Sequence, residues 1–523
     1  MVMINLIVIL LVGGLLSILS ERISDTMPRK EAMGVVLVDL LYLLVCLSGM
    51  PDMTQLQAPV ANVPSSWLMH FKADWIPAFG ISIELALDGI SLLMVLLTLV
   101  LGAIAISASW TDIVVRKGFF EANLLWSLAG VLGVFMSLDL MLFFLFWEVM
   151  LIPMYFMIAI WGHENRGYAA MKFFIFTQAS GLLMLVSILA LVAVNHGATG
   201  TWSFSYFDLL NTEMAEQTAH WIMLGFFIAF VVKLPGFPFH TWLPDAHTQA
   251  PTAGSVILAG ILLKTGAYGR IRFAVPLFPE AALNFSYSAM WLGAAGVVYG
   301  AVLAFGQTDF KRLIAYSSVS HMGFVLLGIY AWNELALQGA VMQMVAHGFS
   351  TAALFMIAGS LQERLHTRDM REMSGLWQQM PRMGAVAMFF VVASLGLPGL
   401  GNFVAEFLVL LGLFQVNVWI TVIAATGLIT GAAYSLLLMQ RSFQGEVNKK
   451  WADNGLADFG PREMLTMGVM MIALILLGIY PQPVLDAAQP VLQSLLELTA
   501  NPALASAEVM QCTRLCSPPW RLF

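Results

Sequence analysis

The sequence predicts an all-α, polytopic membrane protein, and three observations support this fold class. First, 59% of its 523 residues are hydrophobic and only 11% are charged, whereas a soluble domain carries about 25% charged residues. Second, apolar stretches of about 20 residues, the length of a helix that crosses the hydrocarbon core, follow one another along the chain. Third, the Lys and Arg residues are concentrated in alternate loops between these stretches.

The apolar stretches predict about fourteen transmembrane helices. They cover residues 3–20, 33–50, 83–108, 119–137, 138–161, 170–194, 219–244, 252–273, 284–306, 313–331, 337–361, 383–414, 417–440 and 463–486. The seventh and twelfth are expected to be discontinuous, because an LPG triplet interrupts each of them, starting at Leu234 and Leu397. Proline removes an amide donor and glycine permits unusual dihedral angles, so the helical hydrogen bonds open at these points.

The two interruptions lie five helices apart, which predicts a pair of five-helix repeats. Since five is an odd number, the two units would have opposite topologies in the membrane, and inverted repeats place functional sites at broken helices. This predicts four parts: helices 1–3 in residues 1–110, the first repeat in 111–275, the second repeat in 276–445, and the last helix and tail in 446–523.

The distribution of basic residues predicts the orientation. Of the 24 Lys and Arg residues, 17 lie in one set of alternate loops, which we therefore expect in the cytoplasm with both chain termini outside. The five on the opposite side are Lys72, Arg270, Arg272, Arg514 and Arg521, and the remaining two lie within predicted helices.

Two external segments and the tail complete the chain. Residues 195–218 are expected to form an external loop. The loop 51–82 contains SSWLMHFKADWIP, for which two interpretations stay open: its aromatic residues lie on the outer membrane surface, or it is an ordinary ordered loop. The tail 501–523 extends past the last predicted helix.

Composition and motifs exclude several kinds of site. The three cysteines, Cys46, Cys512 and Cys516, form no CxxC pair, and no dense Cys/His cluster is present, so iron–sulfur, zinc and haem sites are not indicated. No GxGxxG or GxxxxGK[ST] motif opens a strand–helix unit, which argues against a nucleotide site. There is also no basic patch for nucleic acid.

Four charged residues lie inside predicted helices, where burial makes a charge unfavourable and a functional role is the first hypothesis. They are Glu148, Lys233, Lys264 and Glu406. Lys233 and Glu406 adjoin the two helix breaks, where opened backbone and water can hydrate a charge. The competing interpretations are a structural ion pair for Glu148 with Lys233, and snorkelling to the membrane surface for Lys264.

Four histidines are weaker candidates. His321 and His347 lie inside predicted helices ten and eleven, where an imidazole can either pass protons or form a simple hydrogen-bonded helix contact. His240 and His247, in FHTWLPDAH, lie near the cytoplasmic end of helix seven, with proton uptake and loop structure equally open. Asp88 and Asp139 stand near helix starts, where carboxylates favour the helix dipole, and we expect both to be structural.

Several long motifs resemble one known family. FWEVMLIPMYFMIAIWG, KLPGFPFHTWLPDAHTQAPTAGSVILAGILLKTGAYG, DFKRLIAYSSVSHMGFV and LGLPGLGNFVAEF, within residues 80–445, resemble the antiporter-like membrane subunits of proton-pumping NADH:quinone oxidoreductase, respiratory complex I. Glutamate at position 406 is similar to the M type of subunit, since the L and N types carry lysine on that broken helix. The L type also has a long lateral helix, for which this chain has no room.

The resemblance implies a role for each buried charge. Glu148 and Lys233 would form the pair of a first half-channel, Lys264 and His347 would belong to a polar axis through the membrane, and Glu406 would lie on the exit side. His321 would lie in or near that axis.

The resemblance also implies a cellular setting. FMN, iron–sulfur clusters and quinone would be held by partner subunits and not by this chain, and its neighbours in the membrane arm would be L- and N-type subunits. The location would be the bacterial inner membrane, with both termini periplasmic. Two alternatives stay open: a subunit of a multi-subunit cation/proton antiporter or membrane-bound hydrogenase, and a self-contained solute transporter.

Overall fold

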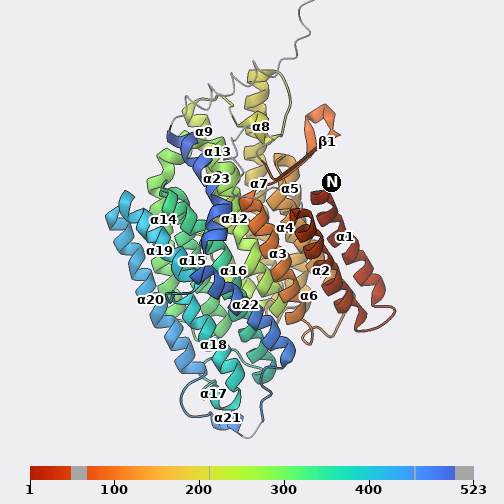
Figure 1. Cartoon of the computed structure of the whole chain (residues 1–523), viewed down its shortest axis with the longest axis vertical. Coiled ribbons are helices and arrows are strands. Elements are labelled where there is room, and N and C mark those ends of the chain that lie inside the picture. Colours follow the sequence, from red (N-terminus) through yellow and green to blue (C-terminus); the bar gives the residue numbers. More distant parts are fainter. Residues whose placement is uncertain (49–66, 211, 453–454, 501–523) are drawn as a thin grey trace, which may run out of the picture.

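The computed structural model describes residues 1–48, 67–210, 212–452 and 455–500, which form a bundle of long helices with one short β-hairpin (Figure 1). By length and composition, eleven helical segments of this described part can cross a membrane. They are α1 (Val2–Ser20), α2 (Met27–Ser48), α3 (Gly89–Ala108), α4 (Lys117–Met136), α5 and α6 together (Leu140–Trp161), α7 (Arg166–Thr199), α14 (Pro279–Phe305), α15 (Phe310–Tyr330), α16 (Glu334–Leu365), α20 (Val418–Ser442) and α22 (Pro461–Ile479).

Both predicted helix breaks are present. Helix α9 (Glu216–Lys233) ends immediately before the first LPG triplet, and α10 (Trp242–Gln249) resumes after it. Likewise, α18 (Pro381–Ser394) and α19 (Gly401–Val416) flank the second triplet. Proline and glycine therefore interrupt the helices where the sequence predicts.

The predicted span 252–273 is not a regular helix. Two π turns, η4 (Leu258–Leu262) and η5 (Arg270–Ala274), alternate with the α-helical segments α11 (Thr252–Ile257), α12 (Leu263–Gly269) and α13 (Val275–Leu277). Arg270 and Arg272, which the distribution of basic residues puts on the outer side, lie in η5 at the end of this span and are buried. Hydropathy identifies an apolar segment, but it does not show where the backbone hydrogen bonds change from the α to the π pattern.

The β-hairpin corrects the prediction that the segment 83–108 is one helix. Strand β1 (Met69–Ile76) pairs antiparallel with β2 (Ile81–Leu87), with Lys72 opposite Glu84. Helix α3 begins only at Gly89, after Asp88, whose side chain accepts a hydrogen bond from the Ser91 amide at 2.8 Å. Only Asp88 separates the apolar residues of β2 from those of α3, so hydropathy averaged over the length of a helix does not mark the change of structure. Part of the loop predicted at 51–82 lies outside the described residues.

The remaining short elements lie at the two ends of the bundle. The hairpin, with the 3₁₀ turn η3 (Pro77–Phe79) and α8 (Tyr206–Leu209), lies at the upper end in Figure 1. Helices α17 (Leu376–Gln379) and α21 (Lys449–Ala452) lie at the lower end. The predicted external loop 195–218 is partly helical, because α7 extends through Thr199.

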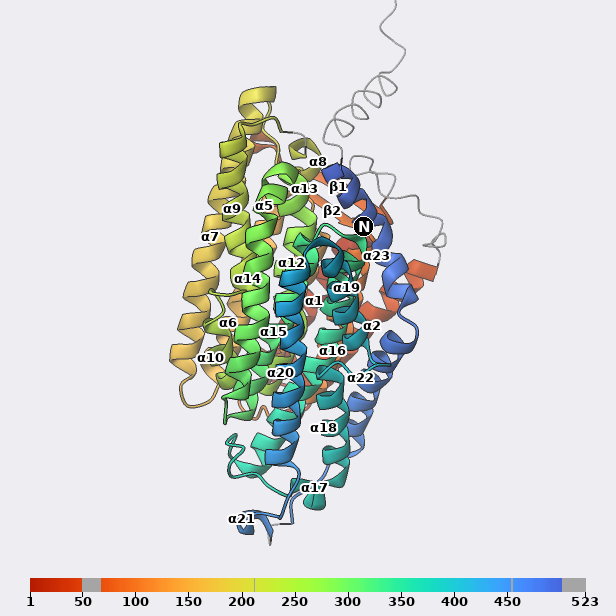
Figure 2. The same cartoon turned by 90° about the vertical axis from the view of Figure 1, so that its left-hand side faces the viewer.

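Helix α23 (Gln482–Ala500) follows α22 and is an element that the sequence analysis does not predict. It lies on the flank of the bundle above α22 (Figure 2) and packs against α3 and α16. Its polar residues alternate with apolar ones, so it lacks the continuous hydrophobicity of a spanning helix. The tail 501–523 lies outside the described residues.

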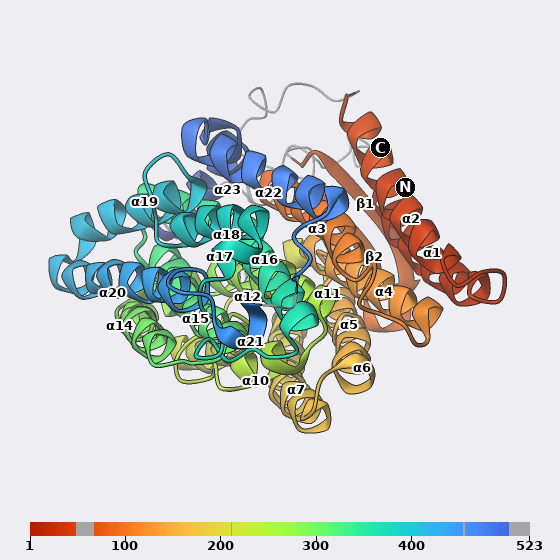
Figure 3. The same cartoon turned by 90° about the horizontal axis from the view of Figure 1, so that it is seen from below.

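Helix α16 occupies the centre of the bundle. It packs against α15, α19 and α11, and its most apolar stretch of 18 residues is completely buried. Helices α1 and α2 lie at one edge and α20 at another when the bundle is seen from below (Figure 3). The central position of α16 makes it the scaffold for the polar side chains described next.

Candidate functional site

Lys264 lies at one end of a buried row of polar side chains. It is the second residue of α12, directly after the π turn η4, and it is fully buried. Its Nζ donates a hydrogen bond to the Ala259 carbonyl at 2.5 Å and lies 2.8 Å from His347 Nδ1. A π turn shifts the backbone hydrogen bonds out of α register, which exposes a carbonyl such as that of Ala259 to a side chain. The turn therefore helps to solvate the lysine.

Two histidines continue the row. The rings of His347 on α16 and His321 on α15 have their centroids 5.5 Å apart at an interplanar angle of 62°. His347 is fully buried, and its Nε2 has no hydrogen-bond partner among the described residues. The two rings are therefore in edge-to-face contact, without a direct hydrogen bond between them among the described residues.

Glu406 ends the row. Its Oε1 lies 2.7 Å from His321 Nδ1 and accepts a hydrogen bond from Gln343 Nε2 at 3.1 Å. The side chain is 2% exposed, so these contacts replace the water that a carboxylate would otherwise need. On the other edge of the His321 ring, Nε2 lies 3.3 Å from Ser394 Oγ and 3.5 Å from Tyr434 Oη.

The break between α18 and α19 positions this end of the row. Ser394 is the last residue of α18, and Glu406 lies in the second turn of α19. Between them Gly396 adopts φ +81°, a left-handed conformation that strains other residues, and a Cβ there would lie 3.3 Å from Glu406 Oε2. Gly396, which directly precedes the LPG triplet, thus leaves room for the carboxylate.

Lys233 and Glu148 lie apart from this row. Lys233, the last residue of α9, is buried, and its Nζ lies 5.4 Å from the ring centroid of Trp147 and 5.7 Å from that of Phe173. Aromatic faces stabilise a cation at such distances. Glu148 is half-buried on α5 beside Gln178, close enough to Lys233 for their charges to interact, but no ion pair joins these two described side chains.

Close packing connects the two regions. A Cβ on Gly266 of α12 would lie 2.6 Å from the Phe230 carbonyl and 2.8 Å from the Leu234 amide, so α12 and the end of α9 touch through their backbones. Lys264 lies two residues before Gly266 on α12, and Lys233 directly precedes Leu234 at the end of α9. Both lysines are therefore close in sequence to this backbone contact.

The structure does not join His240 and His247 to the row through any hydrogen bond between described residues. The His240 ring packs against Tyr299, with centroids 5.2 Å apart. The His247 ring stacks on Phe355 at 4.2 Å, is fully buried, and has no hydrogen-bond partner on either nitrogen among the described side chains.

Sequence reasoning missed three polar members of the site. Gln343 lies one helical turn before His347 on α16, so its spacing of four residues from His347 could have identified it as a neighbour on the same helix face. Ser394 and Tyr434 carry no such signal, because they reach His321 from elements distant in the sequence. No three His, Cys, Asp or Glu side chains in the described part of the chain are arranged to hold a metal ion.

Asp88 and Asp139, which the sequence predicts to be structural residues near helix starts, cap α3 and α5. Asp139 accepts hydrogen bonds from the Met141 and Leu142 amides at the start of α5. Asp88 also forms a buried ion pair with Arg272, whose Nε donates to Tyr268 Oη at 3.2 Å.

Comparison with known proteins agrees with this architecture. Residues 137–430 match the transmembrane family of NADH:quinone oxidoreductase and Mrp antiporters. The chain is 52% identical to NADH-quinone oxidoreductase subunit M of Escherichia coli strain K12, over 95% of this chain and 98% of that protein. It is 54% identical to the subunit M of Pseudomonas aeruginosa, over 92% and 94% of the two chains.

Solved structures show the same fold. A chain of respiratory complex I from Thermus thermophilus is 30% identical and superposes with a TM-score of 0.84, covering 95% of this chain and 100% of that one. A chain of the Mrp complex from Dietzia sp. has a TM-score of 0.79 at 18% identity, with coverage of 96% and 98%, which supports the fold alone. By identity and coverage together, the chain belongs to the family of NADH-quinone oxidoreductase subunit M, the antiporter-like membrane subunits of complex I.

Proposed function

We propose that this subunit translocates protons across the bacterial inner membrane through the row Lys264, His347, His321 and Glu406. The observation that carries the proposal is the succession of contacts in that row: 2.8 Å between Lys264 and His347, a ring contact of 5.5 Å between His347 and His321, and 2.7 Å between His321 and Glu406. Four groups that can each bind a proton follow one another on four helices, α12, α16, α15 and α19, and all four are buried. A purely structural network would not require titratable groups at each position.

In this proposal Lys233 loads the row. Glu148 stabilises the charged form of Lys233 through the interaction of their charges. Movement of that carboxylate away from Lys233 would leave the ammonium without a counter-charge in a low-dielectric site, so its proton would leave towards Lys264 across the α9–α12 contact. Driving one charge against the membrane potential requires about 2.3 kcal/mol per 100 mV. We propose that redox chemistry in partner subunits with FMN, iron–sulfur clusters and quinone supplies this energy.

The proposal is tested by Lys264→Arg in the complete complex reconstituted into proteoliposomes. Arginine keeps the positive charge but does not release its proton, so it would fill the position without passing a proton on. We expect NADH oxidation in the uncoupled state to persist while the acidification measured by a pH-sensitive dye is lost. Wild-type acidification by an assembled Lys264→Arg complex would show that the row is not the proton path.

A further inference from the structure

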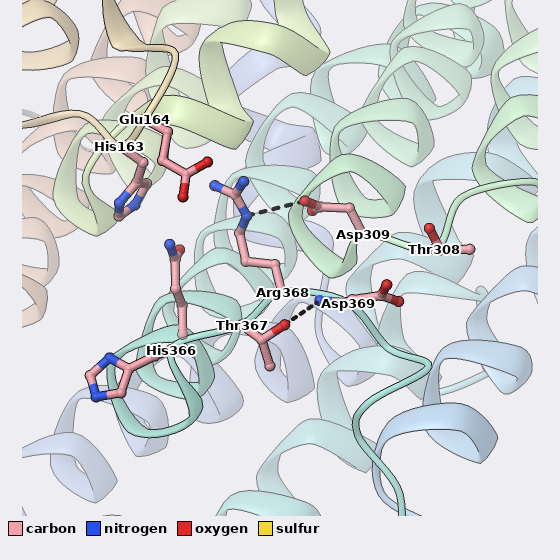
Figure 4. Close-up of a pocket in the computed structure, with 9 residues that line it drawn as sticks. His163, Glu164, Thr308, Asp309, His366, Thr367, Arg368 and Asp369 are labelled. Carbon is pink, nitrogen blue, oxygen red and sulfur yellow. Dashed lines mark hydrogen bonds and ion pairs between the residues drawn. The ribbon is translucent and has the colours of Figure 1, made fainter.

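A cavity of about 510 Å³ lined by polar side chains opens at the C-terminal end of α16. Its walls come from the loops before α4 and α7, the start of α11 and the end of α16, and they include Asp112, His163, Thr252 and Glu363. A second cavity of about 430 Å³ adjoins it and shares His163, Gln362 and His366 (Figure 4). Both lie among loops that the basic residues assign to the cytoplasmic face.

Two carboxyl groups face each other in the first cavity. Glu363 on α16 and Asp112 are within hydrogen-bonding reach of each other, and Thr252 Oγ1 donates to Asp112 Oδ2 at 3.0 Å. Carboxylates are acceptors only, so a hydrogen bond between two of them requires that one holds a proton. The other charged neighbours of Glu363 are Arg364 and Glu463, which form an ion pair with each other at 2.9 Å.

Behind the carboxyl pair, two basic side chains lead inward. His163 Nε2 lies 3.5 Å from Nζ of Lys311, which is fully buried and also contacts the Ala250 carbonyl at 3.4 Å. Burial lowers the pKa of His163 to about 4, and the positive charges of Lys311 and Arg368 act in the same direction, against the weaker effect of Asp112. The imidazole is therefore neutral near pH 7 and can accept a proton from one side and donate one to the other.

His247 lies between this cavity and Lys264. It stacks on Phe355, and the charges of both Lys311 and Lys264 act on it. Along α16, Phe355 is eight residues from Glu363 and eight from His347, which corresponds to about 12 Å in each direction. A fully buried imidazole with no partner on either nitrogen among the described residues therefore stands midway between the carboxyl pair and the central row.

We propose that this cavity is a second proton-uptake site, in which Asp112 and Glu363 share a captured proton and His163, Lys311 and His247 deliver it to Lys264. The inference rests on the proposed function of the central row, but it places uptake at a position independent of Glu148 and Lys233. Each transfer moves one proton from a donor to the next acceptor, and the donor keeps the electron pair of the broken bond. The path returns to its starting state once Asp112 and Glu363 have taken another proton from water.

The test uses Glu363→Gln and Asp112→Asn in the complete reconstituted complex, with acidification measured over a range of pH on the uptake side. A charged cleft raises the local concentration of its ligand by about tenfold or more, so we expect acidification to fall about tenfold at alkaline pH and to recover as the medium becomes acidic. Asp25→Asn is the control, because this exposed carboxylate lies at the same end of the bundle and pairs with Lys117 away from the cavity.

Lys264→Ala measured in parallel separates the two proposals. If Lys264→Ala abolishes acidification while both cavity variants match the wild type at every pH, the uptake site is refuted and the central row stands. If Lys264→Ala pumps normally, the proposed function itself fails. Thr252→Val removes the hydrogen bond to Asp112 without changing charge, so its acidification should show the same pH dependence more weakly. This variant serves as the test if Glu363→Gln or Asp112→Asn does not assemble.

Discussion

Replacing Glu406 by glutamine should uncouple electron transfer from proton translocation. Glutamine preserves the shape of the side chain but removes the negative charge that faces His321 Nδ1 at 2.7 Å. A hydrogen bond to a charged partner contributes about 1.5–3 kcal/mol. Since about 1.4 kcal/mol corresponds to a tenfold change in an equilibrium or a rate, loss of this contact should slow the passage of a proton between His321 and position 406 about 10- to 100-fold.

The assay compares acidification with NADH oxidation in proteoliposomes that contain the complete complex. If protons must pass through the contact of His321 with Glu406, acidification should fall by about the same factor, while NADH oxidation with an uncoupler stays near that of the wild type. Glu280→Gln, at the exposed start of α14, is a control for loss of a carboxylate. Acidification by Glu406→Gln within twofold of the wild type, in a fully assembled complex, would refute the assigned role of Glu406.

Three further predictions concern assembly and stability. Gly266→Val should lower the amount of assembled complex on native gels, because its side chain would collide with the α9 backbone, whereas Gly34→Ala, with nothing within 4 Å of the new Cβ, should not. Asp88→Asn should lower the thermal unfolding temperature, since breaking a buried pair with Arg272 costs about 3–5 kcal/mol. The pKa of His163 is lower in the folded chain than in the unfolded one, so the folded state loses stability as pH falls from about 6.5 towards 4. The thermal unfolding temperature of His163→Gln should therefore depend less on pH in that range than the temperature of the wild type.

The features predicted correctly from sequence are those that depend on local chemistry. Proline and glycine in the two LPG triplets interrupt helices wherever they stand, so both breaks could be located. Lys264 and Glu406 could be selected because a charge inside an apolar segment needs an explanation in any fold. His321 was a weaker candidate, yet the structure places it directly between His347 and Glu406.

The features missed depend on contacts between distant segments. The β2 strand and α3 form one apolar stretch, and only pairing with β1 makes its first part extended. The burial of Arg272 follows from its partner Asp88, 184 residues away in sequence, which no local pattern reveals. The predicted ion pair of Glu148 with Lys233 stays a prediction, since the two charges interact without direct contact.

The π turn before Lys264 makes the spacing of the chain part of the site. An α-helix rotates by about 100° per residue, and a π turn accommodates one residue more than the regular helix. One further residue inserted within Leu258–Leu262 would exceed what the turn accommodates and swing the Lys264 side chain about a quarter-turn away from His347. Every original residue would still be present, but the lysine would point at a different neighbour, so helical phase matters here as much as chemical identity.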